Sequence, residues 1–246
     1  MKRKALPSEL SEALLTDILN GLYPPDSAIP SAEEMARTTG LSRLTVREAV
    51  NALAAKKVLR VEQGRGTFVN PVREWTPSDP VLLMAKASEN GGKVPPARRL
   101  LEARRIVEVA VAGLAAARRQ ESQLADMREA LEGMRRGHAI GDVAAFVDAD
   151  IAFHEAIMAA ADNVFIESLF EPIKGAIHLG RAQTSSFPEE REHAIEHHAR
   201  ILARIKASDR DGAAAAMEAH MRQTAADYAT FLEGPSASDA EATSAM

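Results

Sequence analysis

The chain has 246 residues, of which 46% are hydrophobic and 26% charged, so it can bury a real core and is not a disordered protein. Its formal net charge is −5, but residues 1–75 hold 11 Lys and Arg against 9 Asp and Glu, which leaves the acidic excess to the rest of the chain. The sequence has no cysteine, which excludes disulfides, thiolate metal ligands and thiol nucleophiles.

Neither a membrane span nor a secretory signal is recognisable in the sequence. No apolar run approaches the roughly 18 residues that a spanning helix needs, and no apolar stretch follows the basic residues at the start. We therefore expect a cytoplasmic protein without a membrane partner. A basic N-terminal module on an acidic body is compatible with nucleic-acid binding.

Residues 8–72 have the pattern of three helices followed by a β-hairpin. An amphipathic stretch at 8–20 precedes two short helical patterns that are separated by a tight turn, which is typical of a helix-turn-helix. Ser31 and Ser42 are the expected N-caps of these two helices. The segments "VLRV", "EQGRG" and "TFV" then predict a two-stranded wing around Arg65.

Such a unit reads DNA with the first turn of its second helix, which enters the major groove. There a guanidinium can fork onto guanine or phosphate, and a threonine can meet a base edge. Serines at helix N-termini can bond phosphates, and an arginine between two glycines can approach the minor groove. The sequence thus predicts contacts to double-stranded DNA from Ser31, Ser42, Arg43, Thr45, Arg47 and Arg65.

From Pro80 onward strand patterns are absent, and the helical periods predict an all-α antiparallel bundle. A break is expected in the glycine-containing stretch 137–141. Residues 73–79 are expected to form a linker, and the small polar residues 233–246 a flexible tail. The helices are expected at 80–89, 96–118, 122–136, 142–160, 163–182, 188–207 and 210–232.

The segment "DADIAFHEAI" pairs Asp150 with His154 four residues later, so both side chains share a helix face, about 6 Å apart. Two later helices carry His197, His198 and His220. An Asp and a His from one helix, with one His from each of two others, can converge in a bundle as a metal site. The alternative is that these histidines are ordinary core or surface residues.

The segments "IPSAEEMA", "GLSRLTVREAVNAL" and "GRGTFV" resemble the winged helix-turn-helix of the GntR family of bacterial transcription regulators, over about residues 8–72. Many members of that family have Arg where this chain has Glu33, and a carboxylate cannot bind phosphate, so operator preference is expected to differ. The resemblance implies DNA contacts from Arg43, Thr45, Arg47, Arg65 and Gly66.

The segments "LLEARRIVEVAVAGLAAARR", "DADIAFHEAI" and "HHARILARIKASDRDGAAAAMEAHM" resemble the helical FCD-type domain of the fatty-acid-regulator branch of that family. The resemblance implies an effector-binding and dimerisation domain at 80–232. Because the family usually has Glu at position 197, a swap of roles between His197 and His198 stays open, and Asp148 is a rival for Asp150. The metal ligands that the resemblance implies are Asp150, His154, His198 and His220.

Such nitrogen and oxygen ligands suit Zn²⁺, with Ni²⁺ or Mn²⁺ as alternatives. A sensor would anchor an effector carboxylate on the metal and on a forked guanidinium, which the resemblance assigns to Arg104. The alternative is a surface pair between Arg104 and Glu108. Asn163 is a second effector-binding candidate, although helix capping is its simpler role. The segment "NPVREWTPSDPVLL" is similar to the branch that senses sugar acids such as galactonate or hexuronates; a hydroxy acid is the close alternative.

Together these features predict a homodimeric transcription regulator, most often a repressor in this family, that binds a palindromic operator and a small carboxylate effector. We expect no enzyme activity and assign no catalytic residue, because Asp148 and Glu155, the nominal bases beside a metal, look like ordinary surface acids. Two alternatives stay open: a metal-dependent enzyme with an accessory DNA-binding module, and an architectural DNA-binding dimer without an effector.

Overall fold

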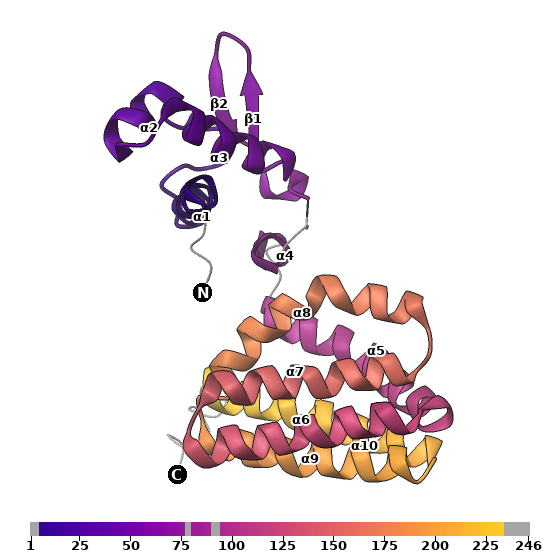
Figure 1. Cartoon of the computed structure of the whole chain (residues 1–246). Coiled ribbons are helices and arrows are strands. Elements are labelled where there is room, and N and C mark those ends of the chain that lie inside the picture. The colour runs from indigo at the N-terminus through magenta and orange to yellow at the C-terminus, as the bar shows by residue number, and fades with distance from the viewer. Residues whose placement is uncertain (1–4, 77–79, 90–93, 234–246) are drawn as a thin grey trace, which may run out of the picture. The chain divides into compact units, whose positions relative to one another are not determined.

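The computed structural model describes residues 5–76, 80–89 and 94–233. The chain divides between Lys93 and Val94 into two compact units (Figure 1), each of which has its own hydrophobic core. In the described part of the chain, no helix combines the length and the apolar character that crossing a bilayer requires.

The first unit begins with α1 (Leu6–Leu19), α2 (Ala32–Thr39) and α3 (Arg43–Ala55). The hydroxyl of Ser31 accepts a hydrogen bond from the backbone N–H of Glu34 at 3.1 Å, and that of Ser42 accepts one from Thr45 at 3.0 Å. Gly40 ends α2 with a φ of 71°, a conformation that glycine adopts without strain. These contacts confirm both predicted N-caps and the tight turn between α2 and α3.

The wing consists of β1 (Leu59–Glu62) and β2 (Gly66–Val69), which pair antiparallel from Leu59 opposite Val69 to Glu62 opposite Gly66. Glycines occupy two positions of positive φ, 75° at Gly64 in the connecting turn and 124° at Gly66, the first residue of β2, where an L side chain would be strained. The predicted winged helix-turn-helix is therefore confirmed, with its wing projecting beyond α3 (Figure 1).

The core of the first unit continues past the wing into the 3-10 turn η1 (Val72–Glu74) and α4 (Pro80–Glu89). Trp75 is 2% exposed, its indole N–H donates to the carbonyl of Asn70 at 2.8 Å, and Leu82 is fully buried in the same core. A linker at 73–79 and a helical domain that starts at residue 80 were expected, whereas the structure places α4 in the first unit. The physical reason is that the large indole ring of Trp75 is buried against apolar side chains, to which α4 contributes Leu82. Positions 77–79 of the expected linker lie outside the described residues.

The second unit is an all-helical bundle, as predicted, in which α6, α7, α9 and α10 run side by side (Figure 1). A short π-helical segment, η2 (Ala229–Glu233), follows the last helix. The expected tail begins there, and its positions 234–246 lie outside the described residues. The helices are α5 (Pro96–Arg118), α6 (Glu121–Ile140), α7 (Val143–Ala160), α8 (Val164–Thr184), α9 (Pro188–Lys206) and α10 (Arg210–Tyr228).

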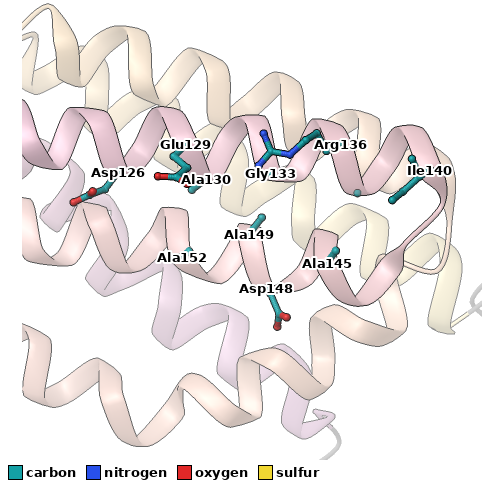
Figure 2. A pocket seen from close by; sticks show the side chains of 11 residues that line it. Asp126, Glu129, Ala130, Gly133, Arg136, Ile140, Ala145, Asp148, Ala149 and Ala152 are labelled. Carbon is teal, nitrogen blue, oxygen red and sulfur yellow. The ribbon is translucent and has the colours of Figure 1, made fainter. Parts of the chain in front are cut away.

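The expected helix break at 137–141 is wrong at 137–140, because α6 continues through Gly137 to Ile140, and only Gly141, the C-cap with a φ of 70°, lies where the break was expected. A Cβ atom on Gly137 would lie 2.7 Å from the backbone nitrogen of Phe146, so this glycine allows α6 and α7 to approach closely. Figure 2 shows the small residues of the two helices along a surface groove of about 700 Å³. Gly137 therefore serves the packing of α6 against α7 and does not end α6.

Candidate functional site

Three histidines converge in the interior of the second unit: His154 from α7, His198 from α9 and His220 from α10. Their side chains are at most 2% exposed, and one ring nitrogen of each lies within 4.8 Å of the others. Neighbouring ring centroids are 4.6 to 5.4 Å apart. The structure thus brings together the three histidines that the sequence singled out, which we call the histidine cluster.

The protonation of His198 follows from its hydrogen bond. Its Nδ1 lies 2.7 Å from the carbonyl oxygen of Ala194, which can only accept, so Nδ1 carries the proton and Nε2 a lone pair. Burial lowers the pKa of His198, which keeps the ring neutral. Nε2 is buried, has no hydrogen bond, and lies 3.2 Å from Oδ1 of Asp150. A nitrogen lone pair and a carboxylate oxygen that face each other can both bind one cation placed between them.

His154 has a carboxylate beside its outer nitrogen. Its Nδ1 lies 2.6 Å from Oε2 of Glu108, in α5. A histidine whose second nitrogen faces a carboxylate is the common arrangement behind a metal ligand, because the carboxylate fixes the tautomer and the ring. The chemistry of the donors therefore suits a divalent cation such as Zn²⁺.

Arg104 pairs with Glu108, as the alternative interpretation held, but the pair is buried and does not lie on the surface. Nε of Arg104 donates to Oε1 of Glu108 at 2.6 Å, and Nη2 lies 3.5 Å from Nε2 of His154. Although burial opposes ionisation, the guanidinium of Arg104 lowers the pKa of Glu108 to about 2. This places a positive and a negative charge in direct contact with the histidine cluster.

Asp150 is completely buried and is held by Arg181 of α8, a residue that the sequence analysis did not single out. Nε and Nη2 of Arg181 donate to Oδ2 and Oδ1 of Asp150, both at 2.9 Å, and Nη1 donates to Glu190 of α9. Burial opposes ionisation of Asp150, but Arg181 holds its pKa well below the usual range. The only available signal for Arg181 was its apolar surroundings in "IHLGRAQ".

The rival residues lie elsewhere. Asp148 has a 72% exposed side chain 3.1 Å from His178, and Glu155 pairs with Lys174 on the same surface. His197 is half-buried, with its ring 5.9 Å from that of His220. Asp150 is therefore buried beside His198 whereas Asp148 is exposed, although among the described residues the ligand atoms within 4.8 Å of one another are those of the three histidines.

Asn163 caps α8. Its side-chain oxygen accepts a hydrogen bond from the backbone N–H of Phe165 at 3.1 Å. This is the simpler role that the sequence suggested, and effector binding by Asn163 stays a prediction.

Acid is expected to destabilise the metal-stripped protein. Burial lowers the pKa values of His198 and His220 below the ordinary 6.5, so below that pH the unfolded chain binds protons that the folded one does not. The free energy of unfolding should thus be highest above pH 6.5 and fall on acidification, by up to about 1.4 kcal/mol per pH unit for each group. Urea unfolding in a chelating buffer measures this. His220→Gln should flatten the dependence; an unchanged slope would contradict the assignment.

The first two turns of α3 carry the exposed side chains of Arg43 and Arg47, and the wing carries Arg65. Arg43 forms an ion pair with Glu33 of α2, and Arg65 pairs with Glu62 and lies over the ring of Phe68. The remaining candidates are placed by local structure: the hydroxyls of Ser42 and Thr45 are 2.9 Å apart, Ser31 caps α2, and Gly66 begins β2. The predicted DNA contacts therefore lie on the helix-turn-helix and the wing, as expected.

Comparisons with known proteins agree with this geometry. Residues 6–69 match the family described as "Bacterial regulatory proteins, gntR family", and residues 99–223 match the FCD domain. The chain is 31% identical to the HTH-type transcriptional regulator LutR of Bacillus subtilis over 212 residues, which cover 83% of this chain and 92% of LutR. It is 33% identical to the galactonate operon transcriptional repressor of Escherichia coli over 152 residues, 62% of this chain and 65% of that protein.

A solved structure described as "Lar controls the expression of the Listeria monocytogenes agr system and mediates virulence" is also similar. It aligns with a TM-score of 0.66 and 20% identity, covering 94% of this chain and 100% of that one. At this identity the likeness concerns the fold alone.

Proposed function

This chain belongs to the GntR family of bacterial regulatory proteins and is a DNA-binding transcription regulator with an FCD domain, and we propose that a small carboxylate, bound at a metal ion in the FCD domain, controls its affinity for operator DNA. The observation that carries the proposal is the buried histidine cluster with the neutral His198 lone pair facing Asp150. Asp150, His154, His198 and His220 would hold the ion, Zn²⁺ by preference. When bound, it would supply a Lewis-acidic anchor for a carboxylate oxygen.

The charges around the cluster support an anionic effector. The buried guanidinium groups of Arg104 and Arg181 face three buried carboxylates, those of Glu108, Asp150 and Glu190, which leaves one net negative charge. A divalent cation would reverse this to one net positive charge, and one carboxylate would then neutralise the site. Arg104 is the residue that we assign to the effector, since its guanidinium lies beside His154.

A sugar acid or a hydroxy acid is the effector class that we propose. Its carboxylate would reach the metal, and its hydroxyl groups suit the polar interior around Arg104 and Glu190. The similar Escherichia coli protein is named as a repressor of a galactonate operon, which supports a sugar acid as effector and repression as the mode of action.

The control of DNA binding follows from linkage between the two sites. We infer a homodimer on a palindromic operator, because two copies related by two-fold symmetry present two recognition helices to two half-sites. Binding of the carboxylate would shift helices of the FCD domain and alter the spacing of the two winged modules. The metal-dependent enzyme alternative lacks support, because both nominal bases, Asp148 and Glu155, pair with surface residues.

The test is a thermal-shift screen of carboxylates against Zn²⁺-loaded and metal-stripped protein. We expect galactonate, glucuronate or lactate to raise the midpoint only when Zn²⁺ is present, since a ligand that binds the native state stabilises it. Galactose, which lacks the carboxylate, is the matched control. For acids that bind, fluorescence anisotropy with DNA selected from a random library should show weaker binding. If no acid in a broad panel changed either quantity, the effector proposal would fail.

A further inference from the structure

Arg181, near the end of α8, brings a buried guanidinium to the edge of the histidine cluster. It forks onto Asp150 through two parallel hydrogen bonds of 2.9 Å, a geometry that fixes both the distance and the plane of the carboxylate. Its third contact is with Glu190 in the first turn of α9. The side chains of Asp150, Arg181 and Glu190 are at most 4% exposed, so solvent does not hold Asp150 in this orientation.

The fork leaves Asp150 able to bind a cation. A carboxylate has about four lone-pair sites, and each oxygen of Asp150 accepts one N–H from Arg181. Oδ1 keeps a free direction and lies 3.2 Å from the buried Nε2 of His198. The guanidinium therefore points one oxygen of fixed orientation at the nitrogen with which it would share an ion.

Glu190 keeps this arrangement anionic. Arg181 alone would neutralise Asp150, whereas the three groups together carry one net negative charge beside the cluster. One oxygen of Glu190, Oε2, is buried without a hydrogen-bond partner in the described structure. Moving charged groups out of water is energetically costly, so stability alone gives little reason for a buried triad of this kind.

We propose that Arg181 is a positioning residue for the metal: it orients Asp150 as a one-oxygen ligand, and Glu190 anchors the guanidinium. This inference rests on the proposed metal site. It differs from a purely structural role for the ion pair, which would stabilise the fold without affecting metal affinity. It also differs from competition, in which Arg181 would withhold Asp150 from the ion.

The experiment uses the full chain and Zn²⁺ alone. The dissociation constant for Zn²⁺ is measured by competition with a chromophoric chelator in wild type, Arg181→Lys, Arg181→Gln and Glu190→Gln. Urea unfolding of each metal-stripped variant is measured in parallel. The matched control is Arg191→Gln, which removes the buried arginine next to Glu190 in α9; it donates to the carbonyl of Ser185, and in the described part of the chain the hydrogen bonds and ion pairs of Asp150 do not involve it.

We expect Arg181→Gln to weaken Zn²⁺ binding by about 10- to 100-fold, the usual effect of removing a partner that orients a ligand. Arg181→Lys should also weaken Zn²⁺ binding, since an ammonium group cannot form two parallel hydrogen bonds to both oxygens of Asp150. If Arg181→Gln does not fold, Arg181→Lys is compared with wild type in its place. The Co²⁺ absorption spectrum should change in both. Arg191→Gln should keep the wild-type constant.

Two results would overturn the inference while leaving the metal site in place: an unchanged Zn²⁺ constant with lowered stability, or tighter binding in the Arg181 variants. The metal site itself fails, and the inference with it, only if wild type does not bind Zn²⁺. The wild-type titration therefore separates the two failures.

Discussion

His198→Ala is expected to abolish tight Zn²⁺ binding, whereas His197→Ala, one position earlier, leaves it intact. His198 is completely buried, and its Nε2 has no hydrogen bond, while His197 is half-buried and lies outside the group of close ligand atoms. Losing an orienting partner already weakens metal affinity about 10- to 100-fold, so the loss of a ligand should exceed that. Equilibrium dialysis followed by metal analysis of untagged protein measures the stoichiometry.

The free energy of unfolding gives an independent measurement on the same two variants, His197→Ala and His198→Ala. Zn²⁺ at 100 times its dissociation constant should raise the free energy of unfolding of wild type and His197→Ala by about 2.7 kcal/mol. The same addition should leave His198→Ala unchanged. Because the two variants lose the same side chain from adjacent positions, the comparison separates ligation from general effects of histidine removal. Stoichiometric Zn²⁺ in His198→Ala, or its loss in His197→Ala, would show that the roles are exchanged.

Arg47→Ala is expected to weaken binding to a selected operator by roughly 10- to 100-fold, which corresponds to about 1–3 kcal/mol for one forked contact to a base. Arg47 is exposed in the first turns of α3, and among the described residues no carboxylate pairs with it. Its guanidinium is therefore available to DNA. Arg73→Ala, which removes an exposed arginine beyond the wing, is the matched control and should bind as wild type does.

The kind of contact can be read from salt dependence. A phosphate contact would weaken binding to all sequences and reduce the salt slope by about 1, whereas a base contact would weaken only specific binding. Arg43 should behave differently, because its pair with Glu33 holds part of its guanidinium. Glu33→Ala should therefore strengthen binding to unrelated DNA by releasing that charge. Equal operator affinity in Arg47→Ala and wild type would contradict the predicted recognition surface.

Much of the candidate site could be predicted from the sequence because its signals are local. Serines in front of helical patterns define N-caps, and the glycines of "EQGRG" define the turn of the wing, since hydrogen bonds and backbone angles involve residues close in the chain. The four-residue interval in "DADIAFHEAI" put Asp150 and His154 on one helix face. Gly137 shows the limit, since a glycine that ends a helix and one that lets two helices touch look alike in sequence.

The sequence by itself determined that the chain has a winged helix-turn-helix, an all-helical second part, and histidines at intervals that suit a metal site. Only the tertiary structure decided that α4 completes the first core around Trp75, that His198 and not His197 enters the cluster, and that Arg181 holds Asp150. The reason is physical: the partners of these side chains come from helices far apart in the chain. Burial then gives an arginine or a histidine a role that neighbouring residues do not specify.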